Sequence, residues 1–77
     1  MSENAILDKV RVILHPILGD IMTESTLLVR CKKIGVDYLA LAAPDLPRLA
    51  PEIQASVTIF VGSEKAKSIA ERILSIS

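Results

Sequence analysis

The turn Gly62-Ser63 is the first place in this chain where the residue types suggest ligand chemistry. It follows the apolar run VTIFV (57–61) and precedes a charged segment of helical character. If 57–61 is a strand, the order strand, glycine, helix leaves free backbone N–H groups at a helix N-terminus, and such groups attract phosphate. The chain lacks the repeated glycines of a P-loop or of a dinucleotide fingerprint, however. A helix that ends at Gly62 and a second helix capped by Ser63 explain the same two residues.

Four other residues carry side chains that bind metal ions or react as nucleophiles: His15, Asp20, Glu24 and Cys31. One histidine and one cysteine, sixteen positions apart, do not match the paired spacing of zinc sites. Asp20 and Glu24 share a helical face, as carboxylates on an ordinary solvated face also do. We therefore expect no bound metal ion.

Cys31 lies in the basic run Arg30-Cys31-Lys32-Lys33. Neighbouring cations lower the pKa of a thiol and so favour nucleophilic chemistry. A catalytic cysteine also needs a base, and His15 is the sole histidine of the sequence. Cys31 equally falls on the apolar side of its segment, which is typical of a core residue. We expect no catalytic residue, no enzyme activity and no cofactor, and Arg30, Lys32 and Lys33 are candidates for contact with an acidic partner.

The elements that position these residues are predicted to be helices, and the first two are separated at His15-Pro16. Over 2–14 apolar residues recur every three or four positions, with Ser2 as the N-cap. Proline lacks a backbone N–H and disfavours helical geometry in the residue before it, so we expect an end or a kink there. A second helix is predicted over 16–34, with a basic last turn and Gly35 as its C-cap. Gly19 and the polar run 23–26 weaken its middle, so a break there is an alternative. The residues expected on the buried faces are Ile6, Val10, Ile13, Leu14, Ile17, Ile21, Met22, Leu28 and Cys31.

The second half of the chain carries the remaining ambiguity between helix and strand. The segment 36–42 is compatible with extended backbone but rich in alanine, which argues against a strand. After Asp45 as an N-cap, apolar residues at spacings of three and four favour a helix through 57–61, and Pro51 is expected to kink or restart it. A last helix follows Gly62-Ser63. The residues expected on the buried faces are Leu46, Leu49, Ala50, Ile53, Val57, Phe60, Val61, Ala66, Ile69, Ala70, Ile73 and Leu74.

These elements predict an all-α fold: a small bundle of four to five short helices that forms a single domain over 1–77. The alternative is an α+β fold with a β-α-β-α arrangement, in which 36–42 and 57–61 are strands. Two strands alone do not make an independently stable sheet, so we favour the helical fold.

Composition excludes several classes of function. Nine basic and nine acidic residues give zero net charge, which argues against a general binder of nucleic acid or of anionic membranes. No signal peptide and no apolar run of about 20 residues are visible. A single cysteine fits a reducing compartment, so we expect a cytosolic protein. Apolar residues make up 51% of the chain and the mean hydropathy is +0.47, a surplus that small domains often bury against a copy of themselves or a partner.

Four short stretches carry a resemblance to a known class of module. They are Leu18-Gly19, Gly35-Val36, DLPRLA (45–50) and FVGSEKA (60–66). Together they resemble small all-helical accessory modules found at the ends of prokaryotic signalling and regulatory proteins, beside receiver-type, kinase or roadblock-type domains. The resemblance covers about residues 16–74, and it implies an interaction role with no catalytic residues.

The sequence therefore favours a cytosolic, non-catalytic module for protein–protein interaction or regulation that self-associates or binds a protein partner. One alternative is a phosphate- or nucleotide-binding β-α-β-α domain that uses the turn at Gly62-Ser63. Another is a helical nucleic-acid-binding protein that makes contact through Arg30, Lys32 and Lys33.

Overall fold

The computed structural model describes residues 4–76, and these are helical except for short connections. No strand occurs between residues 4 and 76, which confirms the all-α prediction. The α+β alternative is wrong, because 57–61 forms the last turns of an α-helix and 36–42 contains only a 3₁₀ turn. Residues 4–76 contain three α-helices, α1 (Ala5–Lys33), α2 (Leu46–Val61) and α3 (Ser63–Leu74), so the predicted count of four to five is not confirmed. Two 3₁₀ helices, η1 (Tyr38–Ala40) and η2 (Ala43–Asp45), lie in the connection between α1 and α2.

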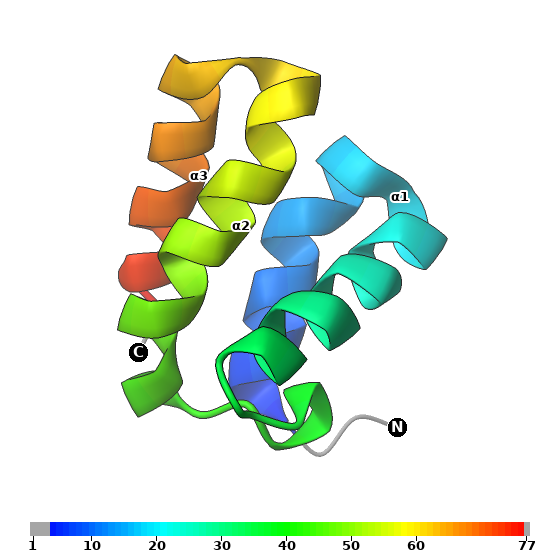
Figure 1. The fold of residues 1–77 in the computed structure, drawn as a ribbon, viewed down its shortest axis with the longest axis vertical. Helices are drawn as coiled ribbons and strands as arrows, with labels where there is room; N and C mark the ends of the chain where they lie inside the picture. The colour runs from blue at the N-terminus through cyan, green and yellow to red at the C-terminus, as the bar shows by residue number, and fades with distance from the viewer. Residues whose placement is uncertain (1–3, 77) are drawn as a thin grey trace.

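Helix α1 is folded back on itself at Gly19, where φ is 77° and ψ is 171°. Figure 1 shows its two halves as a hairpin, the blue one rising and the teal one descending; we call residues 5–18 the first arm and 20–33 the second arm. The predicted break at His15-Pro16 is therefore misplaced, because Pro16 lies inside the first arm. A proline removes one backbone hydrogen bond and bends a helix, but its φ is held near −65°. Reversing the chain within one residue here requires a positive φ, which glycine adopts freely.

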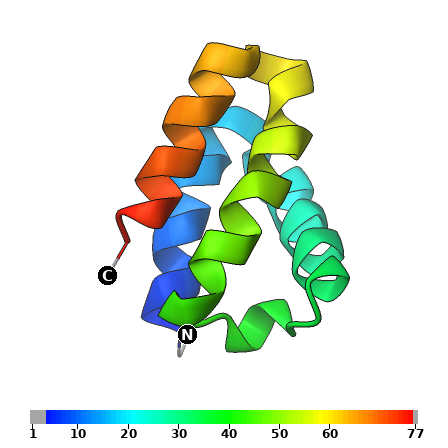
Figure 2. The same ribbon diagram turned by 60° about the vertical axis from the view of Figure 1, so that its left-hand side comes forward.

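Gly62 makes the same kind of turn between α2 and α3, with φ of 84° and ψ of 166°. Both turns lie in a region of backbone conformation that only glycine populates to any extent. The predicted break at Gly62-Ser63 is confirmed, although Gly62 rather than Ser63 occupies the N-cap of α3 and no side chain caps this end. The chain is thus two helical hairpins, and Figures 1 and 2 show α2 and α3 packed side by side against the arms of α1.

The other predicted helix boundaries have mixed outcomes. Gly35 ends α1 as expected, in a Schellman motif where Val36 N–H donates to the Cys31 carbonyl at 2.8 Å and Gly35 N–H donates to the Lys32 carbonyl at 3.0 Å. Pro51 neither kinks nor restarts α2, which runs through it from Leu46 to Val61. Pro51 lacks a backbone N–H, so α2 lacks one hydrogen bond there, while Leu49, Ala50 and Ile53 beside it are buried.

Asn4 begins the first arm and ties it to the loop after α1. Its Oδ1 accepts from the Leu7 N–H at 2.9 Å, which is an N-cap bond. Its Nδ2 donates to the carbonyls of Leu39 at 3.1 Å and Leu41 at 2.7 Å. The N-cap that we assigned to Ser2 lies outside the described residues. One asparagine thus fixes both the start of α1 and the position of η1.

The core is a single aliphatic cluster drawn from both hairpins. The predicted inward faces of the first arm, α2 and α3 are largely confirmed, but Phe60 and Leu74 are more than half exposed. In the second arm Cys31 is buried as predicted, but Thr23 and Leu27 are buried in place of Ile21, Met22 and Leu28. The buried apolar residues are Leu7, Val10, Ile13, Leu14, Leu27, Cys31, Leu41, Leu46, Leu49, Ala50, Ile53, Val57, Ala66, Ile69, Ala70 and Ile73.

By length and composition alone, α1 is apolar enough to cross a membrane. An 18-residue window within it has a mean hydropathy of 1.4, and 22% of that window is buried. The sequence prediction counted only uninterrupted apolar runs and so did not register it. Every 18-residue window of this 29-residue helix contains Gly19, where the chain reverses. In this structure the window is therefore a hairpin and not one straight helix.

Candidate interaction surface

The turn at Gly62-Ser63 is the link of a helical hairpin. The Gly62 N–H donates to the Thr58 carbonyl at 2.9 Å, and the Gly62 carbonyl accepts from the Ala66 N–H at 3.0 Å. Both residues are exposed. The strand on which the phosphate-site interpretation depended is absent, so capping accounts for the two residues.

The four residues considered for metal binding or catalysis have different surroundings. His15 Nδ1 and Asp20 Oδ1 lie 3.6 Å apart across the Gly19 turn, and Glu24 is bound to Arg11. Cys31 is fully buried. Burial, together with the smaller effect of the Asp45 and Asp37 carboxylates, raises the pKa of its thiol to about 11. The thiol is therefore protonated at neutral pH, the opposite of the activation we considered. Within residues 4–76, no three His, Cys, Asp or Glu side chains come together as a metal site would require.

The basic run at the end of α1 joins α1 to α2. Arg30 and Lys33 both reach the Glu52 carboxylate, at 3.3 and 3.5 Å. Lys32 is exposed and borders a hollow of about 480 Å³ with Leu28 and Tyr38. Two of the three predicted contact residues therefore already have a partner inside the molecule.

Arg11 forms a bidentate salt bridge with Glu24 that the sequence analysis did not predict. Its Nε and Nη2 bind the two oxygens of Glu24 at 2.9 and 2.7 Å, and Nη1 binds Asp8 at 3.2 Å. The bond to Glu24 is the main cause of the raised pKa of Arg11. The pair joins the first arm to the second, across thirteen positions of sequence. Only the reversal at Gly19 brings these residues together, so no local signal could have identified them.

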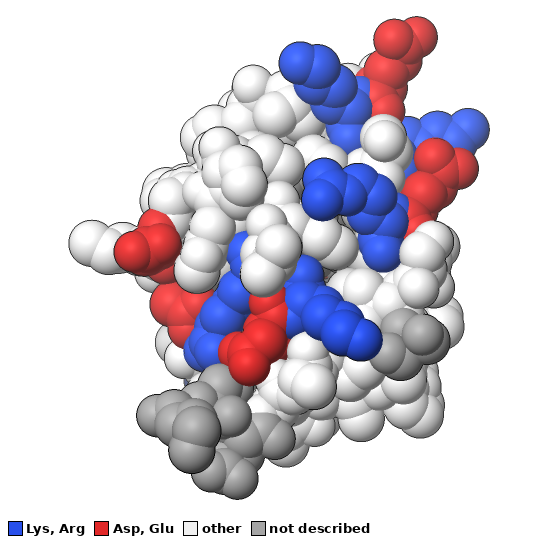
Figure 3. Space-filling model, turned by 180° about the vertical axis from the view of Figure 1, so that it is seen from behind, with Lys and Arg blue, Asp and Glu red and all other residues white. Residues whose placement is uncertain are grey.

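Charges of both signs lie close together on one face of the molecule. On the face seen in Figure 3, blue and red atoms lie next to each other over α3 and over the first arm of α1. No extended field of one sign forms on that face. The charged face therefore offers mixed polar contacts.

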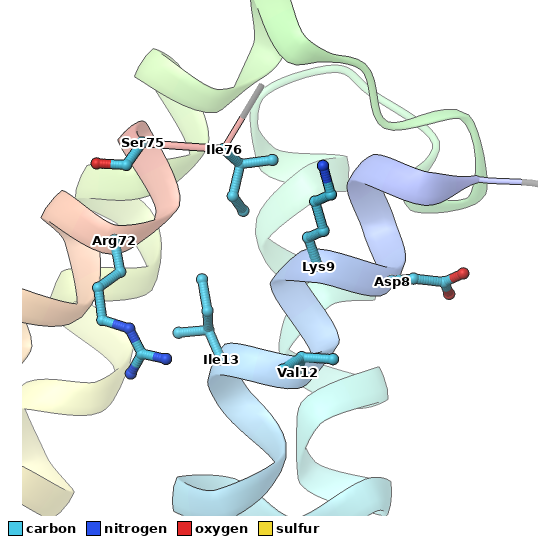
Figure 4. Close-up of a pocket in the computed structure, with 7 residues that line it drawn as sticks. All are labelled: Asp8, Lys9, Val12, Ile13, Arg72, Ser75 and Ile76. Atoms are coloured by element: carbon cyan, nitrogen blue, oxygen red, sulfur yellow. The ribbon is translucent and has the colours of Figure 1, made fainter.

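A hollow of about 510 Å³ lies between the first arm and the end of α3. Figure 4 shows Lys9, Ile13 and Ile76 gathered around it, while Asp8 extends away. Arg72 of α3 and Val12 of α1 complete its walls. Its lining, which also includes Asp8 and Ser75, mixes charged groups of both signs with aliphatic ones.

The most unusual surface is apolar and spans the second arm of α1 and the neighbouring side of α2. We call it the α1–α2 face and define it by these residues: Met22, Val29, Ala55 and Ile59. Ile59 is 86% exposed, and Met22 and Val29 are about half exposed. A hollow of about 290 Å³ lies between the two helices, lined by Met22, Ser25, Thr26, Val29, Arg30, Ala55, Ser56 and Ile59.

Sequence reasoning misassigned this surface because the second arm is apolar on both sides. We predicted Ile21, Met22 and Leu28 to be buried. The spacing of four in Thr23, Leu27 and Cys31 was the signal for the true inward face, but a threonine in that row concealed it.

No protein-family model, no curated protein and no solved structure matches this chain. The resemblance to helical accessory modules stays a prediction.

Proposed function

We propose that this chain is a non-catalytic module for protein–protein interaction, and that it binds its partner through the α1–α2 face. The observation that supports this proposal is the exposure of Met22, Val29 and Ile59, which border one hollow between α1 and α2. Apolar side chains that gather on one surface, unlike scattered ones, are typical of an interaction site. Burying one isoleucine side chain stabilises a complex by about 1.5–3 kcal/mol.

The chemistry of the remaining candidates supports the non-catalytic part of the proposal. The thiol of Cys31 is buried, and its pKa is raised to about 11, whereas a nucleophilic cysteine needs a lowered pKa and access to substrate. An unpaired buried thiol suits a reducing compartment, and we place the module in the cytosol as part of a regulatory assembly. Counting the arms of α1 separately, we interpret the scaffold as four short helices, two of which present the binding face.

The experiment compares dye binding by two matched variants. Ile59→Ser removes the most exposed apolar side chain of the α1–α2 face, and Val12→Ser removes a 68% exposed side chain on the first arm. Both residues lie on helices and both variants introduce the same hydroxyl. We expect the fluorescence of an apolar dye such as ANS to fall with Ile59→Ser and to persist with Val12→Ser.

The opposite ranking, or equal dye binding by the two variants, would contradict the proposal. Circular dichroism of each variant checks that helix content is unchanged. Since both side chains are exposed, we expect neither substitution to unfold the protein.

A further inference from the structure

We propose that this chain has a second binding surface, a groove between the first arm of α1 and α3, and that the groove binds an amphipathic helix with acidic residues. Two hollows, of about 510 and 280 Å³, follow each other along these two helices, and Arg72 lines both. They share no lining residue with the α1–α2 face, so the inference goes beyond the proposed function. We call them the α1–α3 groove and define it by these residues: Ile13, Ile17, Lys65, Ile69, Arg72 and Ile76.

The groove has an aliphatic floor and a cationic rim. Its four isoleucines form the floor, since each is buried or half-buried. Lys65 and Arg72 are exposed on the rim, and Figure 4 shows the Arg72 side chain extending from α3 toward Ile13 of α1. This surface complements a helix that carries acidic residues beside its apolar stripe.

The charges of α3 are sorted between the groove and the outer surface. Lys65 and Arg72 line the groove, whereas their neighbours Glu64 and Glu71 line neither hollow. No salt bridge between residues 4 and 76 involves Lys65 or Arg72. Two cations on the rim are therefore available to an acidic ligand.

The α1 side of the groove adds no unpaired negative charge. Asp8 borders the first hollow, but its side chain extends away from it in Figure 4, and its carboxylate is bound to Arg11 at 3.2 Å. Lys9 is the other charged residue of α1 that lines this hollow. The charge that meets a ligand is therefore positive, which favours an acidic partner over a basic or an uncharged one.

The shape of the groove favours a helix over a small molecule. Lys65 and Arg72 are seven positions apart, so two turns of helix, about 10.5 Å, separate them. Acidic residues seven positions apart on a partner helix that runs along α3 have the same separation, and aliphatic residues between them meet the floor. A small molecule needs a cleft that buries most of its surface, whereas the rim on α3 is exposed.

A synthetic peptide provides the probe. It has about 18 residues, or five turns, with a leucine stripe flanked by glutamates in an alanine background, and it contains one tryptophan. The chain has no tryptophan, so the fluorescence anisotropy of the peptide reports binding directly. We expect saturable binding, and at least about tenfold weaker binding of the same peptide with lysine in place of every glutamate.

Charge reversal on the protein locates the site. One exposed ion pair changes an association constant by up to about fivefold. The double variant Lys65→Glu, Arg72→Glu removes two attractions and adds two repulsions. We therefore expect it to bind the glutamate peptide at least about tenfold more weakly, and the lysine peptide more tightly, than the unaltered chain does.

The double variant Lys32→Glu, Lys67→Glu is the matched control. It makes the same change of net charge at two exposed residues that line neither hollow, and we expect glutamate-peptide binding within about twofold of that of the unaltered chain. Circular dichroism checks that each variant is folded. Equal weakening by the two double variants overturns the proposal, as does equal binding of the two peptides or no binding at millimolar concentration.

Two other occupants are tested with the same variants. If vesicles of phosphatidylcholine and phosphatidylserine bind the chain, the Lys65, Arg72 reversal abolishes this binding and the glutamate peptide does not bind, the groove recognises an anionic membrane and the helical partner is overturned. If sedimentation equilibrium shows self-association that this reversal abolishes, the occupant is a second copy and the proposal is also overturned.

Ile59→Ser separates this inference from the proposed function. We expect this variant to bind the glutamate peptide like the unaltered chain, because Ile59 lines neither hollow of the groove. If Ile59→Ser weakens peptide binding as much as the Lys65, Arg72 reversal does, the groove is not the site. The dye-binding comparison of the α1–α2 face stands or falls independently of that result.

Discussion

Replacing Thr23 with valine should make the protein more stable, because the native hydroxyl is buried without a partner. Thr23 is fully buried on the inward side of the second arm. Its Oγ1 has no hydrogen-bond partner within the described part of the chain. Folding therefore removes this hydroxyl from water without compensation. Valine has nearly the same shape and a similar helix propensity, so the substitution changes little else.

The expected gain follows from the cost of burying an unsatisfied polar group, which is about 1–3 kcal/mol. For a domain of this length, each 1 kcal/mol raises the melting temperature by roughly 4–8 °C. In urea, the midpoint of unfolding should rise while the slope of the transition stays unchanged.

Thr58→Val is the matched control. Thr58 is also on a helix, but its Oγ1 donates to the Gln54 carbonyl at 2.6 Å. The same substitution there removes a satisfied hydrogen bond, so we expect no gain or a loss of about 1 kcal/mol. If Thr23→Val destabilised the protein as much as Thr58→Val does, the Thr23 hydroxyl would have to be hydrogen-bonded in solution, and the reasoning would be refuted.

Three further predictions concern the turns, the cap and the buried thiol. Gly19→Ala and Gly62→Ala should each destabilise the fold by about 1–3 kcal/mol in urea titrations, because both backbones lie in a region that L-residues avoid. The Cβ of L-alanine would meet no atom within 4 Å at either site, so the loss should come from the backbone conformation and not from a clash. D-alanine, which favours positive φ, should therefore be tolerated when it is introduced by chemical synthesis, and an equal loss with both enantiomers would count against a backbone origin. Asn4→Ala should lower the free energy of unfolding by about 1–3 kcal/mol, because it removes both the N-cap bond and the bonds to the loop. Asn4→Asp should keep the N-cap bond, lose only the loop bonds and so lower the free energy of unfolding less. Equal losses in the two variants would show that the loop bonds carry the whole effect. The pKa of Cys31 is raised from 9.0 to about 11 by folding, so its contribution to stability is complete below pH 9 and is lost as the pH rises through 11. Unfolding curves of the protein and of Cys31→Ala should therefore converge over that range, and parallel curves would exclude the shift.

The helix boundaries show where local sequence was sufficient. Gly35 and Gly62 were predicted correctly because a glycine at a helix end, after a completed apolar pattern, is a local signal. The helical assignment of 57–61 was also correct, since the spacing of apolar residues over the whole of α2 outweighed the strand-like composition of five residues.

The break in α1 shows where local sequence misled. Pro16 is the stronger local signal for ending a helix, and Gly19 is tolerated inside many helices. The decision depends on packing: reversing at Gly19 lets Arg11 reach Glu24 and places both arms against the core. That contribution comes from residues distant in sequence, so no window around Pro16 contains it.

The sequence by itself determined that this protein is helical, that its core is aliphatic and that it has more apolar side chains than the core can hold. These follow from composition and from spacing along the chain, which are local properties. Only the tertiary structure decided which apolar side chains remain outside. The second arm offers two apolar faces, and the one that contains Thr23, Leu27 and Cys31 is buried because the hairpin turn at Gly19 orients it toward α2. The α1–α2 face is what that choice left exposed.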